Sequence, residues 1–257
     1  MKLDAFFAEN PRFALAYSGG VDSTYLLSAA KEYGCDVKAY FIKSIFQPQF
    51  ELDDARRMAY MLSAPMTVET IEILKNPDVA ANSPDRCYHC KKAIFTRILE
   101  LAHRDGYTVV CDGTNASDDA GDRAGMQALI ELGVRSPLRE YDMTKPEIRS
   151  LSRAAGLYTH DKPSYACLAT RIPTGTEIKA DCIDTVAKAE EALHVLGFSD
   201  FRIRFFSGAA RIQLPEEQFR TAFDKRRKIL DTLYPYFDAV FLDLLPRKTE
   251  FQTPDTY

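Results

Sequence analysis

The stretch from Phe13 to Thr24, with the sequence FALAYSGGVDST, constrains the fold more than any other part of the chain. Its first five residues are apolar and uncharged, which predicts a buried parallel strand, and the residues from Thr24 to Lys31 predict a helix. Gly19 and Gly20 form a turn too tight for side chains, so backbone N–H groups there can approach an anion closely. The N-terminus of the following helix adds a positive dipole. The sequence therefore predicts a phosphate site between a strand and a helix.

The side chains of this stretch point to a particular kind of phosphate site. Ser18 and Ser23 supply hydroxyl donors, and Asp22 suits a magnesium ion held against the phosphates. The final Gly-Lys-Ser/Thr of a Walker A loop is absent, and no third glycine completes a dinucleotide fingerprint. The pattern Ser-Gly-Gly-x-Asp-Ser instead resembles the PP-loop of ATP pyrophosphatases, which implies cleavage of ATP to AMP and pyrophosphate. The alternative is an ordinary strand-to-helix turn with two glycines.

Length and charge limit the other possibilities. The 257 residues suffice for one large domain, or for one of about 170 residues followed by a small one. A formal net charge of −4 argues against nonspecific wrapping of nucleic acid. No apolar run approaches the roughly 20 residues of a membrane span, and the first residues do not form a signal peptide, so we expect a cytoplasmic protein. Six cysteines in such a chain indicate thiol, metal or redox chemistry rather than a disulfide framework.

The order of predicted elements gives the fold class. Strands are predicted at 13–17, 37–42, 67–73 and 108–111, with helices between them, which predicts an α/β fold with a doubly wound parallel sheet. Ligands of such sheets bind beyond the carboxyl ends of the strands, where the Ser18–Ser23 turn falls. From about residue 176 the pattern changes to helix, strand, strand, helix at 216–234, and strand, which predicts a second, smaller α+β domain. We expect the domains to cover 1–172 and 173–257.

Three cysteines are candidates for chemistry. Ser83 followed by proline predicts a helix start, which places Cys87 and Cys90 near the first turn, one turn apart on the same face. The helix dipole and neighbouring lysines favour thiolates there, and such a pair can ligate one metal centre. Cys167 lies in an irregular segment with cationic neighbours, so it is a candidate nucleophile. A small buried hydrophobic residue is the alternative interpretation of Cys167.

Three further segments have both a functional and a structural interpretation. The loop 112–119 leaves a buried strand and contains Gly113, Thr114, Asn115 and several carboxylates, so it is either a second wall for ATP and magnesium or a plain surface loop. Arg202 and Arg204 share one face of a predicted strand and could hold a substrate phosphate, although a solvated strand face is the commoner explanation. The segment from Thr144 to Glu147 predicts a capping box at a helix start and a structural role.

Together these motifs resemble the LarE family, the ATP-dependent sulfur transferases that make the nickel-pincer nucleotide cofactor. The most specific stretches are SGGVDS at 18–23, RCYHCKK at 86–92, GTN at 113–115 and CLATRIPTG at 167–175. The resemblance implies a PP-loop ATP pyrophosphatase sheet. It also implies ATP binding by Ser18, Gly19, Gly20, Asp22, Ser23, Gly113, Thr114 and Asn115, with Mg²⁺ on Asp22. The segment around Arg123 departs from the family pattern.

The resemblance also implies a reaction. The substrate would be a pyridinium-3,5-biscarboxylic acid mononucleotide, whose carboxylates are adenylated at the expense of ATP and then converted to thiocarboxylates by a sulfur nucleophile. The catalytic residues implied are Ser18, Asp22 and Cys167, and the substrate-phosphate residues are Arg202 and Arg204. Other residues implied to lie near the site are Arg123, Arg171 and Glu190.

The source of sulfur divides the family. Members without the Cys-x-x-Cys pair give up the sulfur of the cysteine matching Cys167, whereas members with three cysteines bind a 4Fe-4S cluster that carries an extra sulfide. Because Cys87, Cys90 and Cys167 are all present, the resemblance implies the cluster-dependent type, a sulfide donor and self-assembly into a homo-oligomer. Three alternatives stay open: a zinc-containing PP-loop amidating or deazapurine synthase with His89 as a further ligand, a tRNA thiolase, and a nucleotide-binding module without activity.

Overall fold

The computed structural model describes residues 2–118 and 123–247, which form two compact units. One unit contains the described residues up to Val79 together with Asp85–Lys162, and the other contains Ala80–Pro84 together with the described residues from Pro163 onward. The chain therefore passes between the units three times. Residues 163–172, which the sequence assigns to the first domain, group with the second unit. The assignment of functions to two domains stays a prediction.

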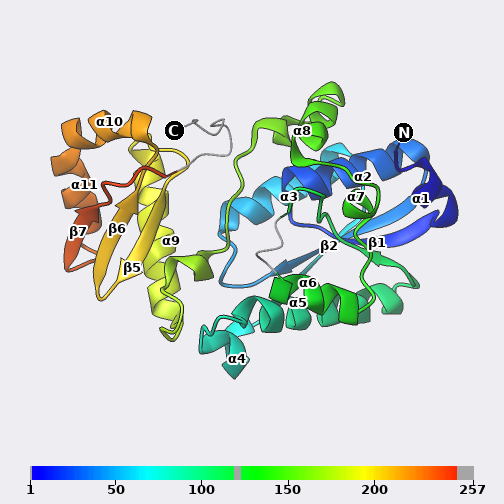
Figure 1. Ribbon diagram of the computed structural model, residues 1–257, viewed down its shortest axis with the longest axis horizontal. Helices are drawn as coiled ribbons and strands as arrows, with labels where there is room; N and C mark the ends of the chain where they lie inside the picture. The colour runs from blue at the N-terminus through cyan, green and yellow to red at the C-terminus, as the bar shows by residue number, and fades with distance from the viewer. Residues whose placement is uncertain (1, 119–122, 248–257) are drawn as a thin grey trace. The chain divides into compact units, whose positions relative to one another are not determined.

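The first unit is built on a four-stranded parallel sheet in the order β3-β2-β1-β4, of which Figure 1 labels β1 and β2. The strands are β1 (Arg12–Ala16), β2 (Asp36–Lys43), β3 (Met66–Thr70) and β4 (Val110–Cys111). The helices are α1 (Asp4–Glu9), α2 (Val21–Tyr33), α3 (Gln49–Met61), α4 (Pro77–Ala80), α5 (Arg86–Arg104), α6 (Arg123–Glu131), α7 (Pro137–Glu140) and α8 (Lys145–Ala154), with short 3₁₀ turns at Ile73–Lys75 and Tyr158–Asp161. The predicted α/β class with a parallel sheet is confirmed.

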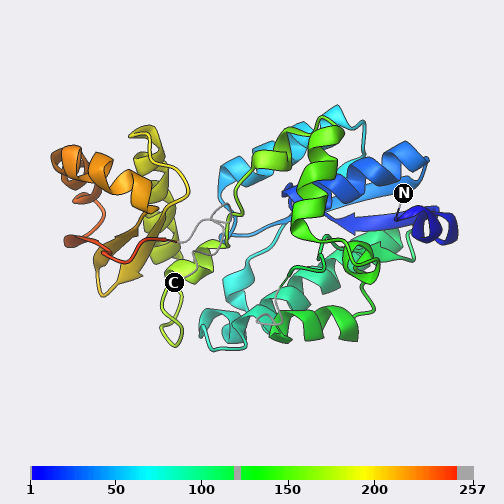
Figure 2. The same ribbon diagram turned by 45° about the horizontal axis from the view of Figure 1, so that its top comes forward.

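Successive side chains along the strands pack into two separate hydrophobic cores, one on each face of the sheet. Phe13 and Leu15 pack with buried residues of α1, α2, α3 and α8 on one face of the sheet. Ala14 and Tyr40 point to the opposite face, where α5 and α6 supply the core. Figures 1 and 2 show these two groups of helices on opposite faces, so the sheet is doubly wound as expected.

The strand order reverses between β1 and β4. Strands β2 and β3 extend the sheet on one side of β1, whereas β4 pairs with its other side. The loops that follow β1 and β4 consequently leave the same edge of the sheet in opposite directions. This is the topological switch point, where parallel α/β sheets bind their ligands.

The second unit contains α9 (Ala180–Val195) and a three-stranded sheet in the order β5-β6-β7. Strands β5 (Arg202–Phe206) and β6 (Ala209–Gln213) are antiparallel, and β7 (Ala239–Leu242) is parallel to β6. The single helix expected at 216–234 is wrong, because the chain forms a 3₁₀ turn (Glu216–Gln218), α10 (Phe219–Asp224) and α11 (Arg226–Leu233). Lys225 separates the two helices, and its ammonium group donates a hydrogen bond to the carbonyl of Leu196 at 2.6 Å.

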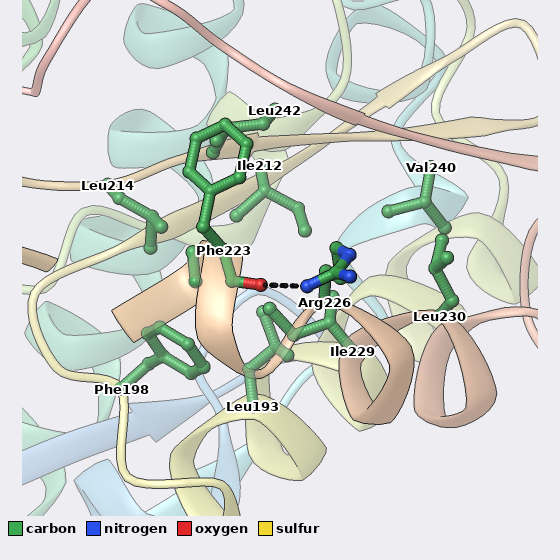
Figure 3. Close-up of a pocket in the computed structure, with 11 residues that line it drawn as sticks. Leu193, Phe198, Ile212, Leu214, Phe223, Arg226, Ile229, Leu230, Val240 and Leu242 are labelled. Carbon is green, nitrogen blue, oxygen red and sulfur yellow. Dashed lines mark hydrogen bonds between the residues drawn. The ribbon is translucent and has the colours of Figure 1, made fainter. Parts of the chain in front are cut away.

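An apolar hollow of about 200 Å³ lies between the sheet and helices of this unit (Figure 3). It is lined by aliphatic and aromatic side chains such as Leu193, Ile212 and Phe223, and the Arg226 guanidinium donates to the carbonyl of Phe223 at 3.1 Å. No residue singled out from the sequence lines this hollow. It is therefore separate from the predicted site.

The short segment Ala80–Pro84 is tied into the second unit by Asn82. Its fully buried side-chain amide donates to the carbonyl oxygens of Pro173 at 2.9 Å and Thr176 at 3.0 Å. The backbone N–H of Gly175 donates to the Asn82 carbonyl at 2.8 Å, and Ile178 bonds in the same way to Ala80 at 2.8 Å. A segment far from the second unit in sequence is thus part of its fold.

Candidate active site

The turn after β1 gathers donors at the start of a helix. The Oγ atoms of Ser18 and Ser23 lie 3.1 Å apart across the turn, and the backbone N–H of Gly20 donates to Ser18 Oγ at 3.3 Å. Helix α2 begins at Val21, directly after Gly20. Hydroxyls and the first N–H groups of the 13-residue α2 therefore meet at one point, which is the arrangement that binds phosphate.

Gly19 is required by both backbone conformation and space. Its φ is +72°, and a Cβ atom there would lie 2.8 Å from the Cβ of Ala55 in α3. We expect Gly19→Ala to lower the free energy of unfolding by about 1–3 kcal/mol more than Gly34→Ala does. Gly34 is a matched control, since its φ is also positive, at +92°, but nothing lies within 4 Å of its added Cβ. Equal losses for the two variants, measured by denaturant unfolding, would show that the contact with Ala55 is unimportant.

The loop after β4 packs directly on the start of α2. A Cβ atom on Gly113 would lie 2.8 Å from the backbone N of Ser23, so no larger residue fits without moving the loop. The buried carboxyl of Asp112 accepts hydrogen bonds from Ser136 Oγ at 2.7 Å and from the backbone N–H of Thr114 at 3.2 Å. Burial raises the pKa of Asp112. Asp112 thus fixes the Gly113–Thr114 turn.

These two loops border an open cavity of about 240 Å³. It brings together five residues predicted from the sequence, namely Ser18, Asp22, Ser23, Gly113 and Thr114. Asn115 is fully buried beside them, where its backbone N–H donates to Asp118 at 2.8 Å and its side-chain oxygen accepts from Ser117 at 2.7 Å. Asp112 and Asp118, two carboxylates of the loop that the sequence predicts as a wall for ATP and magnesium, also line the cavity. Lys91 and Phe95 line it as well, and sequence reasoning did not assign them to the ATP site.

Asp22 is the carboxylate that the first turn of α2 contributes to the cavity. Its Oδ2 accepts from Lys145 Nζ at 2.6 Å, while its buried Oδ1 has no hydrogen-bond partner among the described residues. Burial raises the pKa of Asp22, and the Lys145 ammonium opposes this rise. An unpartnered carboxylate oxygen beside a phosphate-binding turn fits the oxygen ligands that Mg²⁺ requires.

Lys145 is a site residue that the sequence did not reveal. Helix α8 begins at Lys145, as the capping-box pattern predicts, but the side chain of Thr144 makes no capping hydrogen bond. The sequence predicts a structural role for this segment, whereas its lysine binds the carboxylate of Asp22 in the phosphate site. The sequence pattern therefore identified the helix correctly and missed its contribution to the site.

Cys87 and Cys90 are half-buried in the first turns of α5, which starts at Arg86. The Arg86 guanidinium donates to Cys87 Sγ at 3.4 Å. The ring nitrogens of His89 lie 3.2 Å from Asp85 and 3.6 Å from Asp78, so His89 faces carboxylates. No group of three His, Cys, Asp or Glu side chains arranged to hold a metal was found in 2–118 and 123–247. The two thiols share a helix face in the first unit, which fits a site with several thiolate ligands, and Cys167 belongs to the second unit.

Cys167 precedes a 3₁₀ turn at Leu168–Arg171, and this turn is held by a buried ion pair. The Nε of Arg171 lies 2.7 Å from Oε1 of Glu190 in α9, and both residues are almost completely buried. Glu190 also accepts a hydrogen bond from the backbone N–H of Ile203 at 2.9 Å. The structure thus brings Arg171 and Glu190 together beside the Cys167 segment, as members of one network.

Arg202 and Arg204 do not form a solvated strand face. Arg202 is only 4% exposed and donates to the carbonyl of Ser164 at 2.9 Å, while Arg204 donates to the carbonyl of Thr170 at 2.5 Å. Burial, reinforced by the neighbouring charges of Arg171 and Arg247, lowers the pKa of Arg202 to about 10. Both guanidinium groups therefore bind backbone on either side of Cys167. The predicted site residue Arg123 begins α6, and its side chain lies outside the described part of the chain.

A Ser-Gly-Gly turn between a strand and a helix, at the switch point of a parallel sheet, defines a PP-loop nucleotide-binding protein. No family model matches the chain. It is 36% identical over 207 residues to the pyridinium-3,5-bisthiocarboxylic acid mononucleotide synthase of Lactiplantibacillus plantarum, covering 80% of this chain and 75% of that protein. The chain belongs to the LarE family of ATP-dependent sulfur transferases, so it is an enzyme and the resemblance found in the sequence is confirmed.

Two other relatives agree with this assignment. An uncharacterized protein of Synechocystis sp. is 38% identical over 219 residues, which is 85% of this chain and 82% of that protein. A tRNA-specific 2-thiouridylase of Pseudothermotoga lettingae is 26% identical over 191 residues, covering 59% of this chain and 54% of that protein. The second similarity is distant and indicates a shared PP-loop fold. Among the described residues, no helix has both the length and the apolar character needed to cross a membrane.

Proposed function

We propose that this enzyme converts pyridinium-3,5-biscarboxylic acid mononucleotide into the corresponding bisthiocarboxylic acid, with ATP as the activating reagent. The observation that carries the proposal is the phosphate-binding cavity at the switch point, in a chain related over four fifths of its length to a synthase of that product. The first unit would supply ATP chemistry, and the second would hold the mononucleotide.

In the first step a substrate carboxylate oxygen attacks the α-phosphorus of ATP. The bond from that phosphorus to its β-phosphate oxygen breaks, pyrophosphate leaves and an acyl adenylate forms. We assign the phosphates of ATP to the hydroxyls of Ser18 and Ser23 and the N–H groups at Gly19 and Gly20, because these donors converge. Gly113 and Thr114 would form the opposite wall, with the buried Asn115 supporting their loop, and Asp22 would hold Mg²⁺ against the pyrophosphate.

In the second step a sulfur nucleophile attacks the activated carbonyl carbon and AMP departs. The product is a thiocarboxylate, and a second round converts the other carboxyl group. Cys167 is our candidate for the sulfur-handling residue. Arg202 and Arg204 are our candidates for binding the substrate phosphate, and Arg204 is the more exposed of the two. The ion pair between Arg171 and Glu190 would support their position.

We also propose that Cys87, Cys90 and Cys167 hold a 4Fe-4S cluster, which when bound would supply sulfide for transfer. Cys87→Ala and Cys90→Ala are expected to lower iron and acid-labile sulfide content severalfold in protein reconstituted without oxygen. Cys182→Ala is the matched control, since Cys182 is also half-buried but lies on α9. Iron content equal to wild type in both cysteine variants would remove these residues from the cluster.

The reaction itself is tested with purified enzyme, the mononucleotide, ATP, Mg²⁺ and sulfide. We expect substrate-dependent release of AMP and pyrophosphate, and a thiocarboxylate product identified by mass spectrometry. ATP binding without pyrophosphate release would indicate a nucleotide-binding module, and thiolation of tRNA in place of the mononucleotide would favour the distant thiouridylase relatives. Zinc in place of iron would favour the amidating or deazapurine alternative, to which the contacts of His89 give no support.

Self-assembly is part of the same proposal. Several large apolar side chains of the second unit are exposed, including Val195 at 83% and Leu244 at 81%. Exposed apolar surface of this kind commonly marks a protein interface. Light scattering of the purified enzyme measures its mass and decides between a monomer and a homo-oligomer.

A further inference from the structure

The ring of Tyr165 lies near two guanidinium groups of the second unit. The Cζ atoms of Arg171 and Arg202 lie 5.0 Å and 5.3 Å from the centre of its ring. Its hydroxyl donates to Oε2 of Glu190 at 2.5 Å. Burial, reinforced by the charge of Glu190, raises the pKa of Tyr165, so the hydroxyl keeps its proton and remains a donor. One side chain therefore contacts three charged groups.

Two of those charged groups hold the backbone just before Cys167. Arg202 binds the carbonyl of Ser164, and Arg171 donates to the carbonyl of Ala166 at 3.2 Å. The Glu190 carboxylate forms an ion pair with the Arg171 guanidinium and accepts a hydrogen bond from the Tyr165 hydroxyl. The backbone before the thiol is thus held by Arg202 and Arg171, and Arg171, which follows the thiol in the chain, is itself held by Glu190. Tyr165 contacts all three of these charged residues.

The physical reason for an aromatic residue here is the mutual repulsion of the arginines. Two guanidinium groups in a buried setting repel each other, and the attraction of each one to the electron-rich face of a nearby aromatic ring offsets part of that repulsion. The hydroxyl adds a charge-assisted hydrogen bond to Glu190. Phenylalanine would keep the first effect and lose the second, whereas leucine would lose both.

We propose that Tyr165 is a positioning residue for sulfur transfer, which sets the place of the Cys167 thiol through Glu190, Arg171 and Arg202. This inference rests on the proposed function. At saturating mononucleotide, Tyr165 acts on the transfer step and not on adenylation, because the residues assigned to ATP and Mg²⁺ lie in the first unit and a saturating concentration offsets weaker substrate binding. A displacement of about 1 Å at a reacting group can cost about 100-fold in rate.

The test compares Tyr165→Phe and Tyr165→Leu at saturating substrate. We expect ATP–pyrophosphate exchange, which reports adenylation, to stay within about twofold of wild type, while thiocarboxylate formation falls about tenfold for Phe and about 100-fold for Leu. Hydrogen exchange of residues 164–171 is the substrate-independent measurement, and it should accelerate in both variants. Tyr158→Phe is the control, since the Tyr158 hydroxyl donates to the carbonyl of Asp54 in the first unit.

Wild-type rates of transfer and of hydrogen exchange in both variants would overturn the proposal. Parallel loss of adenylation and transfer would also overturn it, because Tyr165 would then be merely structural. If Tyr165→Leu does not fold, the Phe variant still decides, since it keeps the ring. If wild-type enzyme forms no thiocarboxylate, the proposed function fails, and hydrogen exchange still shows whether Tyr165 holds the Cys167 segment.

Discussion

Replacement of Asp22 by alanine is expected to reduce substrate-dependent pyrophosphate release by about 10²–10³-fold. The buried Oδ1 of Asp22 is the oxygen we assign to Mg²⁺, and the metal offsets charge that develops on the departing pyrophosphate. The variant also leaves the Lys145 ammonium without its carboxylate partner. Initial rates of pyrophosphate release at several magnesium concentrations measure the effect.

The control for this variant is Asp53→Asn. Asp53 belongs to α3 of the same unit, but its side chain is 61% exposed and accepts a hydrogen bond from the nearby Gln49. We expect Asp53→Asn to keep wild-type rates. A rate for Asp22→Ala within threefold of wild type would contradict the assignment of the PP-loop as the ATP site.

Glu190→Ala is expected to lower the free energy of unfolding by about 3–5 kcal/mol. The change leaves the Arg171 guanidinium buried without its counter-charge, at a residue that is 1% exposed. It also removes the acceptor of the Ile203 backbone N–H and of the Tyr165 hydroxyl. Urea unfolding followed by tyrosine fluorescence measures the loss.

The neighbouring residue provides the comparison for Glu190. Glu191 occupies the next position of α9 and is exposed, so Glu191→Ala is expected to change the free energy of unfolding by less than about 0.5 kcal/mol. If Glu190→Ala lowers the free energy of unfolding by less than about 1 kcal/mol, water or a local rearrangement must compensate the buried charge of Arg171. The contacts of Glu190 near Cys167 would then contribute less to stability than their short distances indicate.

Local chemistry explains what the sequence predicted well. A buried strand, two glycines and a helix start are adjacent along the chain, so the Ser18–Ser23 turn follows from short-range preferences alone. The alternation of strands and helices likewise determines a parallel sheet, and the carboxyl edge of that sheet determines where the turn lies. These features need no knowledge of contacts between distant residues.

Contacts between distant residues explain what was missed. Asp22 and Lys145 are 123 positions apart, and no sequence pattern around Lys145 predicts that it binds Asp22. The spacing of Arg202 and Arg204 predicts that they share a strand face, but not that this face binds the backbone of the Cys167 segment. The break in the helix at Lys225 depends in the same way on a carbonyl from another part of the unit.

The inserted segment around Asn82 bears on how such enzymes can be recombined. A fragment that starts at Pro163 lacks the buried amide that bonds Pro173 and Thr176, along with the pairing of Ala80 with Ile178. Swapping C-terminal halves between relatives at a single junction would therefore separate structural partners. Chimeras are expected to fold only when residues 80–84 are exchanged together with the C-terminal half that they complete, because the two units are interleaved along the chain.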